Sequence, residues 1–163
     1  MITPLSDEEM AAWVPFVITA TRVVAALDAE MKEAFDVTHL DHALLVLLAG
    51  QPDRRARMGE IAVTMGVDPS VITYRVRRLE KRGLVERSGS DTDRRVVYAH
   101  LTDGGSRLIH EAWPMHAAGV RRHFLDHVGP DQLAVLAEAF GRIQLALERN
   151  RPGSMQSLLA SRY

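Results

Sequence analysis

Cysteine is absent from all 163 residues of the chain. Its absence excludes disulfide bonds, thiolate metal sites and thiol-based redox sensing, and it is compatible with a reducing compartment. The first residues, MITPLSDEEM, lack the basic region of a signal peptide. No apolar run approaches the roughly 20 residues that a bilayer-spanning helix needs. We therefore expect a cytoplasmic protein that has no membrane partner.

Motifs of catalysis are missing too. The sequence has no Gly-rich phosphate loop, no nucleophile motif and no His-Glu-x-x-His set. We expect neither an enzyme nor a cofactor. The length suits one compact domain, or two small lobes that share a core.

Charge is unevenly distributed, although the net charge is only −1. Residues 53–100 carry 11 Lys and Arg against 7 Asp and Glu, whereas the remainder carries 9 against 14. A basic middle between acidic ends is expected where only the middle of a chain meets a polyanion. An unevenly charged, solvated surface would give the same counts, so specific motifs must decide.

Six helices and one β-hairpin are predicted from apolar periodicity and capping residues. The first helix begins with a capping box at Ser6 and Glu9, and Pro15 is expected to bend it. Thr38 is the expected cap of the second helix, and Pro114 is expected to bend the fifth. The predicted helices are residues 6–31, 38–50, 58–66, 69–83, 103–128 and 131–150, with a polar, basic loop at 50–57 and the hairpin at 84–99. Residues 38–102 thus form a winged helix-turn-helix.

The helix at 69–83, PSVITYRVRRLEKRG, is the second of the pair. Ile72, Val76 and Leu79 recur at i, i+4 and i+7 and would face the core. The other face carries small, hydroxyl and basic side chains that suit base edges and phosphates, and the helix N-terminus offers N–H groups to a phosphate. The residues expected to contact DNA here are Ser70, Val71, Thr73, Tyr74, Arg77 and Arg78. Such a pattern is also typical of an ordinary amphipathic surface helix.

The predicted hairpin places Arg94 and Arg95 at its tip. A hairpin tip beside a major-groove helix falls over the neighbouring minor groove, whose negative potential attracts arginine. Asp93 can hold the Arg95 guanidinium by a bidentate pair, and Arg94 would meet a phosphate. The alternative is a solvated charged turn.

These elements resemble the MarR family of bacterial transcriptional regulators. The family's wing pattern is Asp-x-Arg, five residues and then Leu-Thr, and the run from Asp93 through Arg95 and VVYAH to Leu101 and Thr102 matches it in full. The stretch VITYRVRRLEKRGLVER resembles the family's recognition helix and first wing strand, and MGEIA resembles the helix before it. The resemblance covers about residues 5–148.

The resemblance implies a mainly α fold with a small β-hairpin wing. It implies an obligate homodimer in which the N-terminal helix and the last two helices of each chain interlock. It also implies binding to double-stranded DNA at a pseudo-palindromic operator, usually as a repressor that a small aromatic or anionic ligand releases. The expected divisions are an N-terminal dimerisation helix (1–37), a winged helix-turn-helix lobe (38–102), C-terminal dimerisation helices (103–150) and a tail (151–163).

Two other functions stay open on the sequence alone. One is a winged-helix protein-interaction module that does not bind an operator. The other is a metal-responsive regulator, since His116, His123 and His127 have spacings that can chelate a divalent metal. This spacing is a loose motif, and we assign no metal ligand.

The effector pocket implied by the resemblance lies between the dimerisation region and the DNA-binding lobe. Aromatic and cationic side chains would suit an aromatic carboxylate or a phenol. By position, the candidates are Trp13, Phe16, Arg22, His39, His42 and Trp113. Core packing is the alternative role for the aromatic residues among them.

Overall fold

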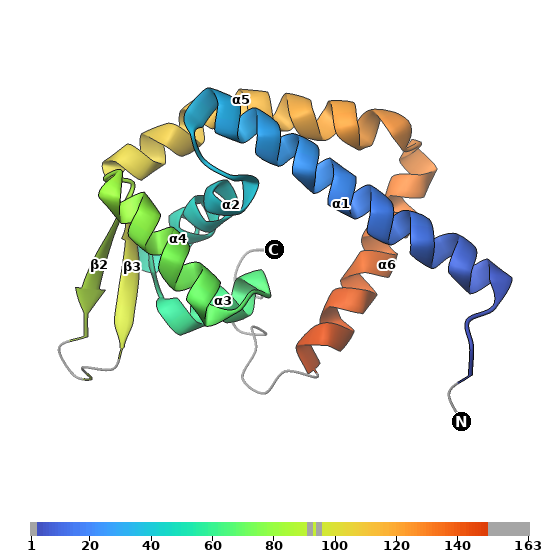
Figure 1. The fold of residues 1–163 in the computed structure, drawn as a ribbon, viewed down its shortest axis with the longest axis horizontal. Coiled ribbons are helices and arrows are strands. Elements are labelled where there is room, and N and C mark those ends of the chain that lie inside the picture. Colours follow the sequence, from blue (N-terminus) through green and yellow to red (C-terminus); the bar gives the residue numbers. More distant parts are fainter. Residues whose placement is uncertain (1–2, 91–92, 94–95, 150–163) are drawn as a thin grey trace.

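A computed structural model describes residues 3–90, 93 and 96–149 (Figure 1). The helices are α1 (Asp7–Phe35), α2 (His39–Ala49), α3 (Met58–Met65), α4 (Pro69–Lys81), α5 (Asp103–His123) and α6 (Pro130–Arg149). The strands are β1 (Arg55–Arg57), β2 (Val85–Gly89) and β3 (Val97–Leu101), and two 3-10 turns are η1 (Pro52–Arg54) and η2 (Leu125–His127). The mainly α fold with a small β wing is therefore confirmed.

The long helices and the winged lobe occupy different parts of the molecule (Figure 1). Helices α1 and α5 run side by side and contact each other. The lobe formed by α2, α3, α4 and the three strands lies below one end of this pair, and α6 descends from the other end of α5. The lobe is thus attached to the long helices at one end only.

Capping residues set the connection between α1 and α2. Ser6 and Glu9 form the predicted capping box at the start of α1. Asp36 ends the helix in a left-handed conformation, with φ 52°. Thr38 and Asp41 form a second capping box at the start of α2, so the direction of the chain is fixed within three residues.

The apolar stripe of α4 packs into the core of the winged lobe. Ile72, Val76 and Leu79 are fully buried, as their spacing predicted. They pack in one cluster with residues of α2, α3, the strands and the start of α5. The other side chains of α4 lie outside this cluster.

The sheet has one strand more than the hairpin predicted from the sequence. Its order is β1-β3-β2, with β3 antiparallel to both neighbours. β1 lies in the segment that was predicted to be a loop. Its central residue, Ala56, points into the core between the exposed Arg55 and Arg57. The expected hairpin is present, and its register pairs Val85 with Leu101 through to Gly89 with Val97.

The fifth helix is shorter than predicted. It ends at His123 and is followed by η2, whereas the sequence pattern extended it to residue 128. Pro114 lies inside it. Near its start, an added Cβ on Gly105 would collide with the Leu84 carbonyl oxygen and the Leu101 side chain. This close approach holds α5 against the hairpin.

Helix α1 exposes most of its apolar residues in the single chain. Trp13, Phe16 and Ile18 are each more than two-fifths exposed. By length and composition alone, α1 could cross a membrane, contrary to the expectation from the sequence. Arg22 interrupts its apolar stretch. An apolar helix face of this length is also what a protein partner would cover.

Candidate nucleic-acid interface

The side chains of α4 outside the core divide between two flanks of the helix. Ser70, Thr73 and Arg77 follow one another at i, i+3 and i+7 on the flank nearest the wing, and Thr73 and Arg77 line a groove there. Arg75 and Arg78 lie on the other flank and reach the connection between α1 and α2. Tyr74 points outward between them and is 68% exposed.

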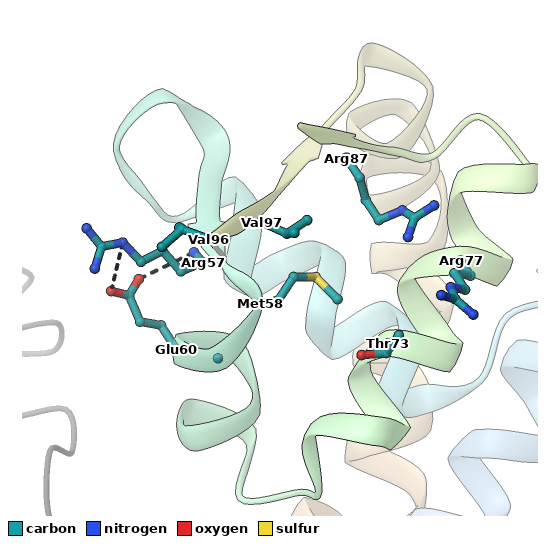
Figure 2. A pocket seen from close by; sticks show the side chains of 9 residues that line it. Arg57, Met58, Glu60, Thr73, Arg77, Arg87, Val96 and Val97 are labelled. Carbon is teal, nitrogen blue, oxygen red and sulfur yellow. Dashed lines mark hydrogen bonds and ion pairs between the residues drawn. The ribbon is translucent and has the colours of Figure 1, made fainter. Parts of the chain in front are cut away.

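The groove between α4 and the wing has a volume of about 580 Å³ (Figure 2). Arg77 comes from α4, Arg87 from β2 and Arg57 from the end of β1. Figure 2 shows Arg77 and Arg87 on one side of the groove and Arg57 on the other. The remaining lining residues are Met58, Gly59, Glu60, Thr73, Val96 and Val97. Three guanidinium groups around one open groove favour a polyanionic partner.

Arg57 is positioned by the sheet. Its Nε donates a hydrogen bond to the Tyr98 hydroxyl over 3.3 Å, and its backbone N–H donates to the Glu60 carboxylate. The bond to Tyr98 is the main cause that raises the pKa of Arg57, and the charges of Glu60 and Asp93 act in the same direction. Arg55 stacks over the same Tyr98 ring at 5.1 Å. The sequence analysis missed this role, because the alternation of Arg, Ala and Arg covers only three residues, which is too short to identify a strand.

Arg87 is held by an ion pair across the groove wall. Its Nη2 lies 2.7 Å from Glu80 Oε2 of α4. The hydrogen bond from Arg87 lowers the pKa of Glu80. The pair therefore joins the first wing strand to the recognition helix and fixes the width of the groove between them.

The N-terminus of α4 already has an anionic partner. Asp68 accepts hydrogen bonds from the Ser70 backbone N–H at 2.8 Å and from the Ser70 hydroxyl at 2.6 Å. These bonds lower the pKa of Asp68. A phosphate at this helix end, which the sequence suggested, would have to share these donors with the carboxylate.

Arg78, which is predicted to contact DNA, has partners within the chain. Its Nη2 donates to the Asp36 carbonyl oxygen at 2.9 Å and lies 3.7 Å from Asp41 Oδ2. In this conformation its guanidinium is engaged with the connection between α1 and α2. Of the predicted set, Ser70, Tyr74 and Arg77 are exposed, and Val71, Thr73 and Arg78 are partly buried.

Of the predicted wing-tip residues, only Asp93 lies within the described part of the chain. Its backbone N–H donates to the Ser90 hydroxyl, and its carbonyl oxygen accepts from the Val96 N–H. These bonds form the base of the tip. Arg94 and Arg95 lie outside the described residues.

The candidate ligand-binding residues separate into two groups. His39, His42 and Trp113 gather around His116, whose ring centroid lies 5.3, 4.8 and 6.1 Å from theirs. His42 is 2% exposed, whereas Trp113 is 56% exposed, so this group reaches from the interior to the surface.

The other group lies where α1 meets α6. Trp13 stacks near Phe16 at 5.9 Å, and Phe16 lies 5.8 Å from Phe140. Arg22 is exposed on α1. Trp13 and Phe16 therefore belong to an apolar surface shared by α1 and α6, away from the histidine group.

The histidines suspected of chelation have other partners. His123 Nε2 lies 2.7 Å from the Glu30 carboxylate, and His127 Nε2 lies 2.9 Å from the Arg122 carbonyl oxygen. The bonds from His123 and Arg122 lower the pKa of Glu30. Within the residues that the structure describes, no group of three or more His, Asp or Glu side chains is arranged to hold a metal ion.

Comparison with known proteins agrees with this geometry. A family model described as MarR family matches residues 35–96. The chain is also similar to Sco3205, a MarR family transcriptional regulator from Streptomyces coelicolor solved in complex with DNA. The two share 30% sequence identity, the TM-score is 0.84, and the match covers 97% of each chain.

Two curated relatives come from Bacillus subtilis. YkoM, an uncharacterized HTH-type transcriptional regulator, is 39% identical over 72 residues, which are 43% of this chain and 47% of YkoM. This chain thus spans about half the length of YkoM. The HTH-type transcriptional repressor MdtR is 28% identical over 128 residues, which are 78% of this chain and 82% of MdtR. The chain is a member of the MarR family of transcriptional regulators.

Proposed function

We propose that this regulator binds a pseudo-palindromic operator in double-stranded DNA as a homodimer, and that it acts in the cytoplasm. The observation that carries the proposal is the groove between α4 and the wing, which Arg57, Arg77 and Arg87 surround. Each recognition helix would enter the major groove through Ser70, Val71, Thr73, Tyr74 and Arg77. Arg95, braced by Asp93, would enter the neighbouring minor groove, and Arg94 would meet a phosphate.

The exposed apolar surface supports the homodimer. Apolar side chains of α1 and α6 are exposed together, among them Phe16, Ile18, Phe140, Ile143 and Leu147. A stretch of this size is rare on a monomer and is typical of an interface between subunits. A second copy of the chain would cover it and would place two recognition helices roughly 34 Å apart, one turn of DNA.

Repression is the simplest action of such a dimer, because it needs no contact beyond the operator. The relative MdtR is described as a repressor. We further propose that a small aromatic or anionic ligand relieves repression by binding beside His39, His42 and Trp113. Such a ligand must bind the DNA-incompetent state more tightly than the DNA-bound state.

A selection from random duplexes, followed by a salt titration, tests the proposed DNA binding. We expect one enriched inverted repeat, a stoichiometry of one dimer per duplex, and a steep loss of affinity as salt rises. Sedimentation of the free protein tests the dimer. Equal, weak binding to every duplex would contradict operator binding and would favour the protein-interaction module instead.

A further inference from the structure

The first turn of α2 connects the recognition helix to the long helix α5. Thr38 and Asp41 face α4, where both accept hydrogen bonds from Arg75 Nη1, at 2.6 and 3.0 Å. His39 and His42 alternate with them along the turn. The His39 ring stacks on His116 of α5, and the His42 ring is tilted against it. One helical turn therefore contacts both partners through adjacent residues.

Asp41 is the centre of this connection. Its side chain is fully buried, and Arg75 is only 21% exposed. The second carboxylate oxygen of Asp41 accepts the Thr38 backbone N–H at 2.9 Å. A buried carboxylate needs such partners, because an unpaired charge in the interior is strongly destabilising. The pair with Arg75 thus constrains where α4 can lie.

Two further arginines extend the same contact along α4. Arg78 donates to the Asp36 carbonyl oxygen, and Arg82 donates to the carbonyl oxygens of Asp36 and Phe35. Together with Arg75 they occupy i, i+3 and i+7 on one flank of the helix. This flank is held by the connection between α1 and α2, while the neighbouring flank faces the wing.

The same junction contains unsatisfied polar atoms. Among the described residues, the buried side-chain nitrogens without a hydrogen-bond partner are His39 Nδ1, His42 Nε2, His116 Nδ1 and Arg75 Nε. Unsatisfied buried donors and acceptors are costly, so each of these atoms would gain from a hydrogen-bond partner. All four atoms lie where α2 contacts α4 and α5, beside the pair of Arg75 with Asp41.

We propose that Arg75 and Asp41 are positioning residues for DNA recognition. Their ion pair fixes the orientation of α4 relative to α2 and α5, and so sets the affinity for the specific sequence without either residue touching DNA. The inference rests on the proposed operator binding.

A positioning residue differs from a DNA-contacting residue in what its loss does. Removing a phosphate contact weakens binding to every sequence and reduces the salt dependence. Misorienting the recognition helix weakens only the specific complex, since nonspecific binding depends on charge rather than on base contacts. The ratio of the two affinities therefore separates the two roles.

The test is a double-mutant cycle on DNA binding. The variants are Arg75→Met, Asp41→Asn and the combination of both, with Arg107→Met as a control that removes an exposed cation from α5. Dissociation constants are measured for the selected duplex and for an unrelated duplex, beside the thermal midpoint and the dimer mass. We expect each single variant to lose about tenfold on the selected duplex and less than about twofold on the unrelated one. The double variant should lose no more affinity for the selected duplex than the more impaired of the two single variants. Arg107→Met should bind like the wild type.

Three results would overturn the proposal: unchanged specific affinity, an equal loss on both duplexes, or additive losses in the double variant. If Arg75→Met fails to fold, Arg75→Lys keeps the charge but not the planar guanidinium whose Nη1 contacts Thr38 and Asp41. A reduced specific affinity in Arg75→Lys would then support the proposal, and wild-type affinity would contradict it. If the wild type itself shows no sequence preference, the proposed operator binding fails first and this inference falls with it.

Discussion

The imidazole rings of His42 and His116 lie 4.8 Å apart, centroid to centroid, where α2 packs against α5. Each ring has a buried nitrogen that has no hydrogen-bond partner among the described residues. Burial is the main cause that lowers the pKa of His42 to about 4, and the charges of His116 and His39 lower it further. The His42 ring is therefore neutral at physiological pH, and burial also lowers the pKa of His116.

The stability of the protein should fall on acidification because of His42. Its pKa is about 4 in the folded chain and 6.5 in a model peptide, so the unfolded chain binds more protons between these values. The stability that the neutral His42 ring contributes is fully present above pH 6.5 and is lost as the pH falls towards 4. Between pH 7.5 and 4.5, the free energy of unfolding of the wild type should drop by about 2 kcal/mol more than that of His42→Gln. Denaturant unfolding at a series of pH values measures this.

The control for this pH series is His110→Gln, because His110 is exposed on the same helix as His116. This variant should keep the pH dependence of the wild type. Parallel curves for His42→Gln and the wild type would mean that His42 keeps an ordinary pKa despite its burial.

Gly105 should tolerate no side chain. A Cβ there would lie well inside contact distance of the Leu84 carbonyl oxygen and the Leu101 side chain, so α5 or the hairpin must shift. Gly105→Ala is expected to lower the free energy of unfolding by about 1–3 kcal/mol. Gly59→Ala is the matched control, since nothing lies within 4 Å of its Cβ position. If Gly105→Ala is as stable to unfolding as Gly59→Ala, or more stable, then α5 and the hairpin separate easily.

Apolar periodicity and capping residues predicted the helices correctly where neighbouring residues determine the structure. The stripe of Ile72, Val76 and Leu79 and the cap at Thr38 lie where the sequence placed them. Strand β1 was missed because its three residues are too few for a periodic signal, and it becomes a strand only by pairing with β3. Its inward-facing Ala56 is a weak apolar signal between two charged residues.

Contacts between distant segments were beyond the reach of the sequence. Arg78 lies next to Tyr74 on the helical wheel, and only the position of Asp36 and Asp41 determines that it turns towards the connection between α1 and α2. The meeting of His42 with His116 likewise depends on how α2 packs against α5. The sequence named His39 and His42 as ligand candidates together with Trp13 and Phe16, but the fold divides these residues between two places.

Arg95→Ala should weaken operator binding by about 1–3 kcal/mol without lowering the thermal midpoint. In the proposed complex this arginine lies over the minor groove, and its loss would remove an electrostatic contact there. The loss should be larger for operators with A·T-rich flanks, where the groove is narrower. Fluorescence anisotropy with flank variants of the selected duplex measures both effects. Wild-type affinity in an intact dimer would remove the role of the wing tip.

Arg77→Ala tests the groove itself. Arg77 lines the groove with Arg57 and Arg87, and the apolar stripe of α4 is buried without it, so the fold should survive its loss. We expect binding to the selected duplex to weaken by about 1–3 kcal/mol. A slope of log affinity against log salt that decreases by about 1 would assign Arg77 to a phosphate, whereas an unchanged slope with relaxed sequence preference would assign it to a base. Arg107→Ala, on α5, is the control for net charge. If both variants bind like the wild type, the groove is not the DNA-binding surface, and the partner of the three arginines must be sought among proteins.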